Sequence, residues 1–232
     1  MKHCYLLLLS FLAVLGLQAQ TVHFEVGGGF AKHYGSSKPI GSYKIGIAYE
    51  HELDQHWTIA PALYLYGKGW KEPNTLVPIV TLDGEPVYEA DGVTPRMGVK
   101  SVANAANYLT LPVTFNYYHR LGESRYLVLG AGPYVAYGLF GDRKIKGDTS
   151  LPGTQKYFYA TRTFSLPDAK RFDAGLVVKC GYQLNSEFTI GLESNFGLVK
   201  SLGGRNLSAL LTLTYCLHWG GTHVRGDIAR PH

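Results

Sequence analysis

The sequence contains eight stretches in which apolar and polar side chains alternate. A period of two places apolar side chains on one face of a strand and polar ones on the other, which a helix would not do. The stretches cover residues 22–32, 43–52, 57–66, 108–118, 126–140, 172–183, 188–198 and 207–215. Each is long enough for a tilted strand to cross the hydrocarbon core of a membrane, and an even number of strands allows an antiparallel ring. We therefore expect an all-β fold, an eight-stranded antiparallel transmembrane β-barrel.

The connections between these stretches alternate between short and long. Short turns are expected at residues 53–56, 120–125 and 185–186, whereas long connections begin at Lys71 and Gly141. The first and last connections on the long side, near Ser36 and Gly203, are short. Outer-membrane barrels have short periplasmic turns and longer outer loops. The pattern predicts short periplasmic turns, two long outer loops and both termini in the periplasm.

The N-terminus has the features of a secretory signal peptide. A basic start at Met1 to His3 precedes an apolar stretch over residues 5–15, and Ala19 provides a small residue at the cleavage position. We expect a signal peptide over residues 1–19, an outer-membrane β-barrel over 20–219 and a periplasmic tail over 220–232. The predicted location is the bacterial outer membrane, in a multi-pass arrangement.

The composition agrees with a membrane barrel. Only 17% of the residues are charged, whereas the chain has 28 Gly, 17 Tyr and 10 Phe. Small residues suit the inside of a barrel and aromatic residues suit its two membrane borders. The formal net charge of +5 is too mild to indicate a nucleic-acid partner. The expected partners are the lipids of the outer membrane.

Aromatic residues are predicted to lie at both ends of the strands, all on the outward face. Two such belts are what a membrane-spanning barrel requires. The periplasmic belt consists of Tyr49, Trp57, Tyr117, Tyr182 and Tyr215, and the outer belt of Phe30, Tyr43, Tyr137 and Phe172.

Charged residues occur on the inward face of the predicted strands. They are Glu25, Lys44, Glu50, Asp173, Lys179 and Glu193. The interior of an eight-stranded barrel is just wide enough to be filled by its own side chains. Buried charges are normally retained in pairs or networks. We therefore expect these residues to pair with one another; a proton or ion path is the alternative.

No motif indicates catalysis, a cofactor or a metal. The glycines at 27–29 lack the helix and the lysine of a phosphate-binding loop. Cys180 and Cys216 lie on non-neighbouring strands with opposite parity, which argues against a disulfide. An outer-rim hydrolase built on His33, Ser36 and a loop carboxylate would be the enzymatic alternative, but that spacing is non-specific. Three histidines near the short turns, His51, His56 and His119, lack partners at ligand spacing. We expect that the protein is not an enzyme.

The two long connections differ in charge. Residues 71–102 carry a net charge of −2, and residues 141–171 carry +4. They could attract one another above the barrel or remain two separate solvated loops. Asp83 and Gly84 lie between β-prone runs, which predicts a hairpin that projects beyond the membrane.

The motifs of the central strands give the chain a family resemblance. The motifs are Asn-Tyr-Leu-Thr-Leu-Pro-Val at 107–113, Leu-Gly-Ala-Gly-Pro-Tyr at 129–134, Phe-Asp-Ala-Gly-Leu at 172–176 and Gly-Leu-Glu at 191–193. With them the chain resembles the PorT family of outer-membrane barrels, whose name-giving member is needed for protein export through the type IX secretion system. The shared motifs are structural, so the resemblance implies no catalytic or ligand-binding residue.

The resemblance suggests an accessory component of type IX protein secretion, which exports surface proteases and adhesins and so bears on virulence. Other secretion-system subunits would then be its partners. A stand-alone structural or adhesive small barrel is the alternative, and a small-solute porin is a third reading.

Overall fold

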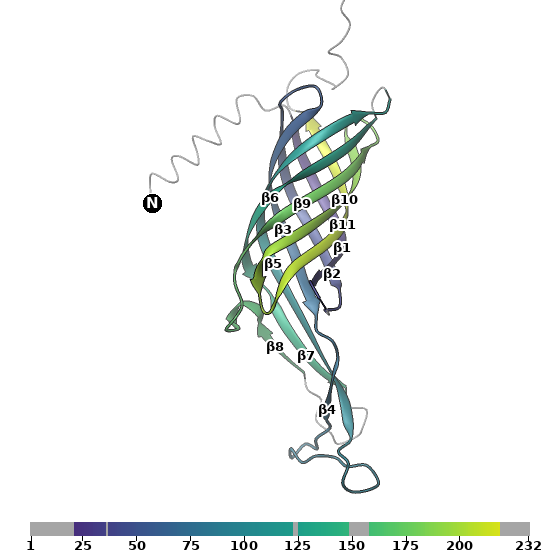
Figure 1. The fold of residues 1–232 in the computed structure, drawn as a ribbon, viewed down its shortest axis with the longest axis vertical. Coiled ribbons are helices and arrows are strands. Elements are labelled where there is room, and N and C mark those ends of the chain that lie inside the picture. The colour runs from purple at the N-terminus through teal and green to yellow at the C-terminus, as the bar shows by residue number, and fades with distance from the viewer. Residues whose placement is uncertain (1–20, 36, 123–124, 149–157, 219–232) are drawn as a thin grey trace, which may run out of the picture.

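The computed structural model describes residues 21–35, 37–122, 125–148 and 158–218, and its main element is a tilted antiparallel β-barrel (Figure 1). The strands are β1 (Thr21–His33), β2 (Ile40–Glu52), β3 (Trp57–Lys71), β4 (Thr75–Pro78), β5 (Met97–Arg120), β6 (Tyr126–Phe140), β7 (Asp142–Asp148), β8 (Phe158–Arg162), β9 (Phe172–Gln183), β10 (Phe188–Ser201) and β11 (Gly204–His218). A single turn of 3₁₀ helix, η1 (Thr163–Ser165), follows β8.

Eight of these strands form a closed ring. Their order is β1, β2, β3, β5, β6, β9, β10 and β11, and β1 pairs with both β2 and β11. Every pairing in the ring is antiparallel. The predicted eight-stranded antiparallel barrel is therefore confirmed. The remaining strands, β4, β7 and β8, lie outside the ring.

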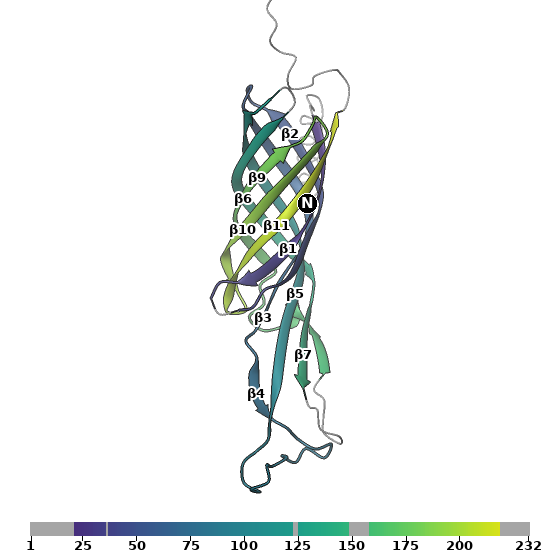
Figure 2. The same ribbon diagram turned by 90° about the vertical axis from the view of Figure 1, so that its right-hand side faces the viewer.

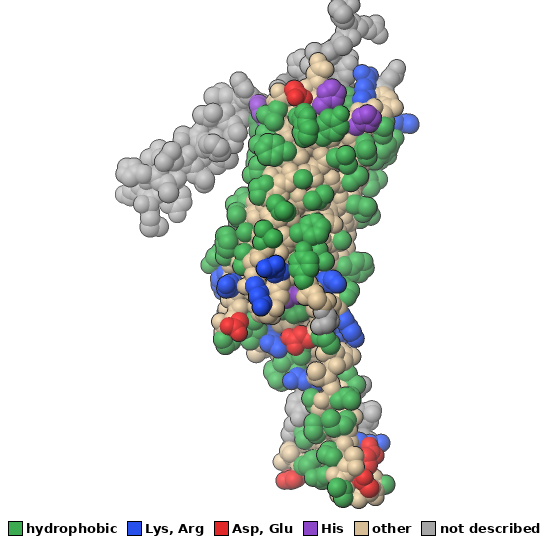
Figure 3. All heavy atoms as spheres, in the orientation of Figure 1, with side chains coloured by type: hydrophobic (Ala, Val, Ile, Leu, Met, Phe, Trp, Pro, Cys, Tyr) green, Lys and Arg blue, Asp and Glu red, His purple; other side chains and the backbone are tan. Residues whose placement is uncertain are grey.

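The two faces of the barrel wall differ in polarity. Apolar side chains alternate outward, and Leu211, in the middle of β11, is 59% exposed. Inward positions carry buried polar side chains such as Lys44 and Glu193. Figure 3 shows apolar side chains, the apolar band, over most of the barrel wall on the face in view. An apolar outside and a polar inside are the arrangement that a lipid environment favours. Among the described residues, no helix is long and apolar enough to cross a membrane.

Two of the short turns at one end of the barrel are fixed by a side chain that accepts backbone hydrogen bonds. Asp54 Oδ1 accepts hydrogen bonds from the amides of His56 at 2.7 Å and Trp57 at 2.8 Å. Asn185 Oδ1 does the same for Glu187 at 3.0 Å and Phe188 at 2.7 Å. Asp and Asn favour turns because their side chains can satisfy nearby amides in this way.

At the opposite end, β10 and β11 join through a two-residue turn. Ser201 pairs with Gly204, and the two residues between them have positive φ, 48° for Leu202 and 83° for Gly203. Positive φ at both central positions is the geometry of the hairpin turn that matches the twist of two antiparallel strands.

The two long connections contain three additional short strands, β4, β7 and β8, which the sequence did not predict. The predicted strand over residues 108–118 is the inner part of β5, which has 24 residues and begins at Met97. Beyond the ring, β4 and β7 pair with β5, and β8 pairs with β7. Figure 2 shows this four-stranded sheet projecting from one end of the barrel. The sequence does not reveal a strand over residues 97–106, because small or polar residues occur on both of its faces.

The projecting sheet, which we call the extension, ends in a predicted turn. The amide of Thr81 donates to the carbonyl of Glu85 at 2.7 Å, and Gly84 has a φ of 89°. The hairpin expected at Asp83 and Gly84 is confirmed. The two oppositely charged connections also meet, through the pairing of β5 with β7 and an ion pair between Arg143 and Glu72 at 3.3 Å.

The position of the apolar band can be tested with a charge at two depths. Leu211 lies at the middle of the outward row of β11, whereas Leu198 lies near the end of the row in β10. We expect Leu211→Lys to lower the free energy of unfolding by about 2–4 kcal/mol and Leu198→Lys by about 0–1 kcal/mol, because the cost of a lipid-facing cation falls toward the membrane border. Denaturant titration of protein in lipid vesicles measures both. An equal loss of unfolding free energy in both variants would show that the apolar band is not centred near Leu211.

Candidate functional site: the closed lumen and the outer extension

The middle of the lumen is built around the buried ammonium group of Lys44 on β2. Its Nζ donates a hydrogen bond to Glu25 Oε1 on β1 at 2.7 Å and another to Glu193 on β10. The hydroxyl of Tyr64 on β3 also donates to Glu25. Lys44 is 1% exposed, so its charge is stabilised by these carboxylates and not by water.

A second charged layer lies toward the extension. Lys68 Nζ on β3 contacts Asp173 Oδ2 on β9 at 3.1 Å, and Asn206 Nδ2 on β11 donates to the same oxygen at 3.0 Å. The ammonium group also lies 4.3 Å from the ring centroid of Tyr134 on β6. Lys68 was not among the predicted interior residues because the expected strand stopped at Tyr66. Its even-numbered position, which continues the inward row of that strand, was the available signal.

A third layer surrounds Glu50 at the end of the barrel that carries the short turns. Glu50 accepts hydrogen bonds from the hydroxyl of Tyr118 at 2.7 Å, from Asn116 Nδ2 at 3.3 Å and from the hydroxyl of Thr58. His23 Nε2 lies 3.1 Å from its other oxygen. The sequence reading missed His23, which lies at the beginning of β1 on the inward face. The Glu50 layer links β1, β2, β3 and β5.

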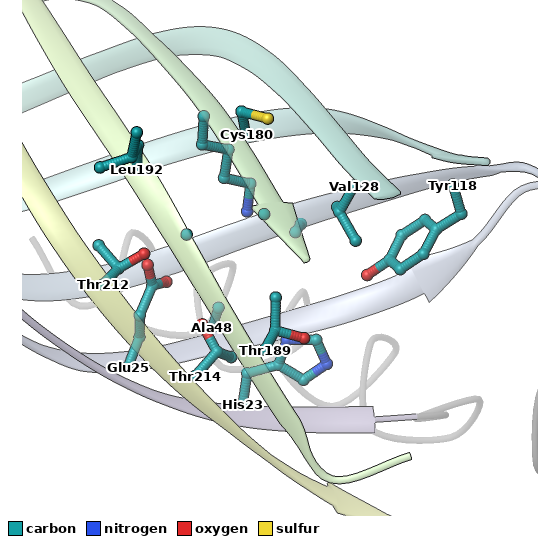
Figure 4. A pocket seen from close by; sticks show the side chains of 14 residues that line it. His23, Glu25, Ala48, Tyr118, Val128, Cys180, Thr189, Leu192, Thr212 and Thr214 are labelled. Atoms are coloured by element: carbon teal, nitrogen blue, oxygen red, sulfur yellow. The ribbon is translucent and has the colours of Figure 1, made fainter. Parts of the chain in front are cut away.

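Lys179 differs from the other predicted interior charges. It lines a small cavity of about 40 Å³ together with Glu25 and His23. Figure 4 shows Glu25, Thr212, Thr214 and Tyr118 around this cavity. In the part of the chain that the structure describes, no carboxylate lies within 4 Å of the Lys179 ammonium group. The expected close pair at Lys179 is therefore not formed. A cavity of this size with polar walls has room for ordered water.

Aromatic side chains pack at both ends of the lumen. At the end that carries the extension, Phe164 of η1 packs edge-on against Tyr108 with ring centroids 5.8 Å apart, and the Thr163 hydroxyl donates to the carbonyl of Ala105 at 2.7 Å. At the other end, Tyr118 and Tyr126 form a buried cluster with Val128. These caps and the three charged layers fill the interior. The porin alternative is disfavoured, because a solute path requires open cross-section.

The aromatic residues predicted for the two belts lie at the strand ends. Trp57 and Tyr117 are direct partners on β3 and β5, with ring centroids 5.1 Å apart. Tyr137 and Phe172 are direct partners on β6 and β9. Side chains at the end with the short turns are half-buried or exposed, and these are Tyr49, Trp57, Tyr117, Tyr182 and Tyr215. Those at the other end are all exposed, and these are Phe30, Tyr43, Tyr137 and Phe172.

The residues considered for catalysis or metal binding are not assembled into a site. His33 is buried and stacks on Trp70 with ring centroids 3.4 Å apart. Ser36, like the predicted signal peptide over 1–19 and the whole predicted tail over 220–232, lies outside the described residues. Cys180 and Cys216 are free thiols. In the ranges that the structure describes, no group of three His, Cys, Asp or Glu side chains could hold a metal.

The extension is held to the barrel wall by continuous backbone pairing and by a polar contact. Val102 on β5 and Ile145 on β7 are direct partners, and both are buried. Glu72 Oε1 accepts a hydrogen bond from Asn104 Nδ2 at 3.2 Å in addition to its ion pair with Arg143. Because β5 runs without interruption from the barrel into the extension, the two parts are expected to be mechanically continuous.

Comparison with known proteins places the chain in a family. The family model described as the outer membrane protein beta-barrel domain matches residues 15–203. The chain belongs to this family. The bacterial outer membrane is therefore its location, and outer-membrane lipids surround its apolar band. The match does not single out the PorT family.

Several solved structures are similar to this family member. The attachment invasion locus protein Ail of Yersinia pestis, in complex with the heparin analogue sucrose octasulfate, is 13% identical, with 86% of this chain and 99% of Ail covered and a TM-score of 0.39. Neisserial surface protein A is 11% identical, with coverages of 86% and 96% and a TM-score of 0.42. The N-terminal barrel domain of Pseudomonas aeruginosa OprF is 11% identical, with coverages of 86% and 98% and a TM-score of 0.32. No curated protein sequence matches.

The charged layers predict a graded response to the loss of one carboxylate. Among the described residues, Asp173 is the one carboxylate that forms an ion pair with Lys68, whereas Lys44 pairs with both Glu25 and Glu193. We expect Asp173→Asn to lower the free energy of unfolding by about 3–5 kcal/mol, as for a broken buried ion pair. Glu193→Gln should cost less, because Lys44 keeps Glu25.

Denaturant unfolding of the purified barrel in vesicles measures both costs. The matched control is Glu187→Gln, an exposed turn carboxylate, which should stay within about 0.5 kcal/mol of the wild type. If Asp173→Asn were as harmless as the control, the Lys68 charge would not depend on this pair.

Proposed function

We propose that this chain is a closed outer-membrane anchor that holds the extension outside the cell as a binding surface, and that it serves as an accessory component of type IX protein secretion. The observation that carries the proposal is the contrast between the two parts of the molecule. The lumen is filled by buried ion pairs and aromatic caps, whereas β5 continues past the membrane as an ordered sheet. A filled barrel cannot pass cargo, so its action must come from contacts made at its ends.

The proposed orientation puts both termini in the periplasm and the extension outside. Thr21 of β1 pairs with His218 of β11 at the end of the barrel that carries the short turns. The extension leaves the opposite end, as Figure 1 shows. In outer-membrane barrels short turns face the periplasm and the longer segments face outward.

The extension offers an open strand edge to a protein partner. Its order is β4, β5, β7 and β8, so β4 and β8 are its outer strands. Among the described strands, β8 pairs with β7 alone, and its residues 159–162 are all exposed. Unpaired amides and carbonyls at a sheet edge are a template for an added strand from another chain. We propose that β8 receives such a strand, from another secretion-system subunit or from cargo. The secretion setting is supported by the resemblance to the PorT family.

A stand-alone adhesive barrel is the second candidate, and the tip of the extension favours it. Leu76, Leu82 and Val93 are 66%, 68% and 78% exposed, although they lie outside the apolar band. Exposed apolar side chains on a projecting surface are typical of contact sites for other proteins. In this reading the tip, and not the β8 edge, makes the functional contact, and a role in virulence would follow from adhesion.

Two replacements in the extension separate these functions. Residues 147–161 are replaced by a short glycine-serine linker in one strain, which removes most of β8, and residues 81–94 are replaced in another. We expect the first change to impair export of surface proteases and adhesins and the second to leave export intact. A strain that lacks the whole gene shows the full loss of export with which the two replacements are compared. The heat-dependent gel shift of the folded barrel shows that each variant assembles.

The results distinguish three outcomes. Export lost with the 147–161 replacement supports the secretion role of β8. Normal export in the gene deletion, together with adhesion lost in the 81–94 replacement, would replace it with the adhesive role. Export lost only when residues 221–232 are deleted would place the contact surface in the periplasm and contradict the proposal.

A further inference from the structure

A row of cations follows the apolar band at its outer border on four neighbouring segments. In β1 the outward row runs from Phe30 to Lys32, and in β11 it runs from Leu207 to Arg205. In β10 it runs from Leu198 to Lys200. Just before β9, exposed Lys170 precedes Phe172 by two residues. Each cation is the first outward residue beyond the last apolar one. We call Lys32, Arg205, Lys200 and Lys170 the cationic arc.

The four cations form one surface because their segments are adjacent. β1 pairs with β11, and β11 pairs with β10. Lys170 and Lys200 line the same open groove, which has a volume of about 420 Å³. The backbone of Lys170 is fixed to β10, since its amide donates a hydrogen bond to the Ser201 hydroxyl at 3.0 Å. Figure 3 shows Lys and Arg side chains gathered where the apolar band ends.

The charges of the arc lack protein counter-charges. Within the described ranges, no carboxylate lies within 4 Å of any of the four cationic groups. Asp168 lines the groove as well, so one negative charge faces the two lysines there. Lys200 and Arg205 are direct partners across β10 and β11. Like charges directly opposite each other destabilise a sheet unless something neutralises them.

A second like-charge pair lies at the same end of the barrel. Lys38 and Lys71 face each other in an isolated antiparallel bridge, with backbone hydrogen bonds of 2.7 and 2.9 Å. The periplasmic end is different, since the exposed cations Arg120 and Arg125 occur there with the acids Glu52, Asp54 and Glu187. The four cations of the arc therefore lie together at one end, beside the apolar band.

We propose that the cationic arc binds a phosphorylated lipid of the outer leaflet. Acyl chains would lie on the outward column of Phe30, Leu207 and Leu198, and the phosphate groups would reach Lys200, Arg205 and their neighbours. Arg suits this role because its guanidinium group can donate two parallel hydrogen bonds to one phosphate. The arc occupies the first outward position beyond the apolar band. This is the depth at which the head groups of lipids lie. The inference requires the orientation proposed above and is independent of a role in secretion.

The binding test uses the full-length protein in phosphatidylcholine vesicles with lipid A as the probe. Three additions are compared: lipid A carrying two phosphate groups, lipid A without phosphates, and inorganic phosphate alone. The readouts are the amount of lipid retained by the detergent-extracted barrel, measured by native mass spectrometry, and the thermal midpoint. We expect retention and a raised midpoint with phosphorylated lipid A only.

The double variant Lys200→Gln with Arg205→Gln tests the site itself. We expect its apparent affinity for phosphorylated lipid A to fall about fivefold for each lost cation, or about 25-fold in total. The matched control, Arg120→Gln with Arg125→Gln, removes the same charge from the opposite end and should bind as the wild type does. Removal of the like-charge pair should also raise the midpoint of the double variant in vesicles that lack lipid A.

Two results would overturn the proposal. One is equal loss of affinity in the arc variant and in the control, which would mean that only net charge matters. The other is retention of lipid A without its phosphates as strong as that of the phosphorylated form, which would mean that the apolar band alone binds the lipid. An equal rise of the midpoint with inorganic phosphate would assign the arc to a free anion and not to a lipid.

Discussion

The buried charge in the lumen is the constraint on which the rest of the structure depends. An ammonium group removed from water is stable only with counter-charges and hydrogen bonds. Lys44 meets this requirement with Glu25 on the neighbouring strand β1 and with Glu193 on β10. Because β10 and β2 are separated in the ring by β11 and β1, the second contact reaches across the interior. The Lys68–Asp173 pair does the same between β3 and β9. These pairs favour one closed ring with one register.

The same constraint directs function away from the barrel interior. Charged layers and the tyrosines around them occupy the cross-section, and Phe164 closes the outer end above Tyr108. The barrel wall meanwhile presents lipid with an apolar surface that contains few polar groups. The features that barrel architecture does not require lie at the end opposite the short turns, where β5 extends into a sheet and the cationic arc borders the apolar band.

The alternation of residues was sufficient to predict the ring and most of its interior. Glu25, Lys44, Glu50, Asp173 and Glu193 were recognised because each lies on the inward parity of a clearly alternating strand. Lys68 was missed because it lies just beyond the expected strand boundary, and boundaries are the weakest part of such predictions. His23 lies inside the expected strand on its inward face, but it was not counted among the interior charges. Lys179 was expected to pair, but alternation fixes only the face of the barrel and not the distance to a carboxylate.

The extension could not be predicted in the same way. Ala103, Ala105 and Ser101 give the outer half of β5 little contrast between its faces, because this part is not embedded in lipid. Its pairing with β7 also joins residues about forty positions apart, which a local pattern does not indicate. The cationic arc is a similar case. Its four residues are unremarkable in the sequence and become a surface only when the register of β1, β11 and β10 is known.

Electrical conductance of the purified barrel in planar lipid bilayers tests the closed-lumen account most directly. The unmodified protein should insert without a large, stable, ohmic current, since Tyr66, Tyr134, Lys44 and Lys68 fill the interior. Insertion itself can be verified by protease protection of the strands on the same membranes. A steady current of the size given by porins, recorded from the unmodified protein, would contradict the account and show that the charged layers line a path.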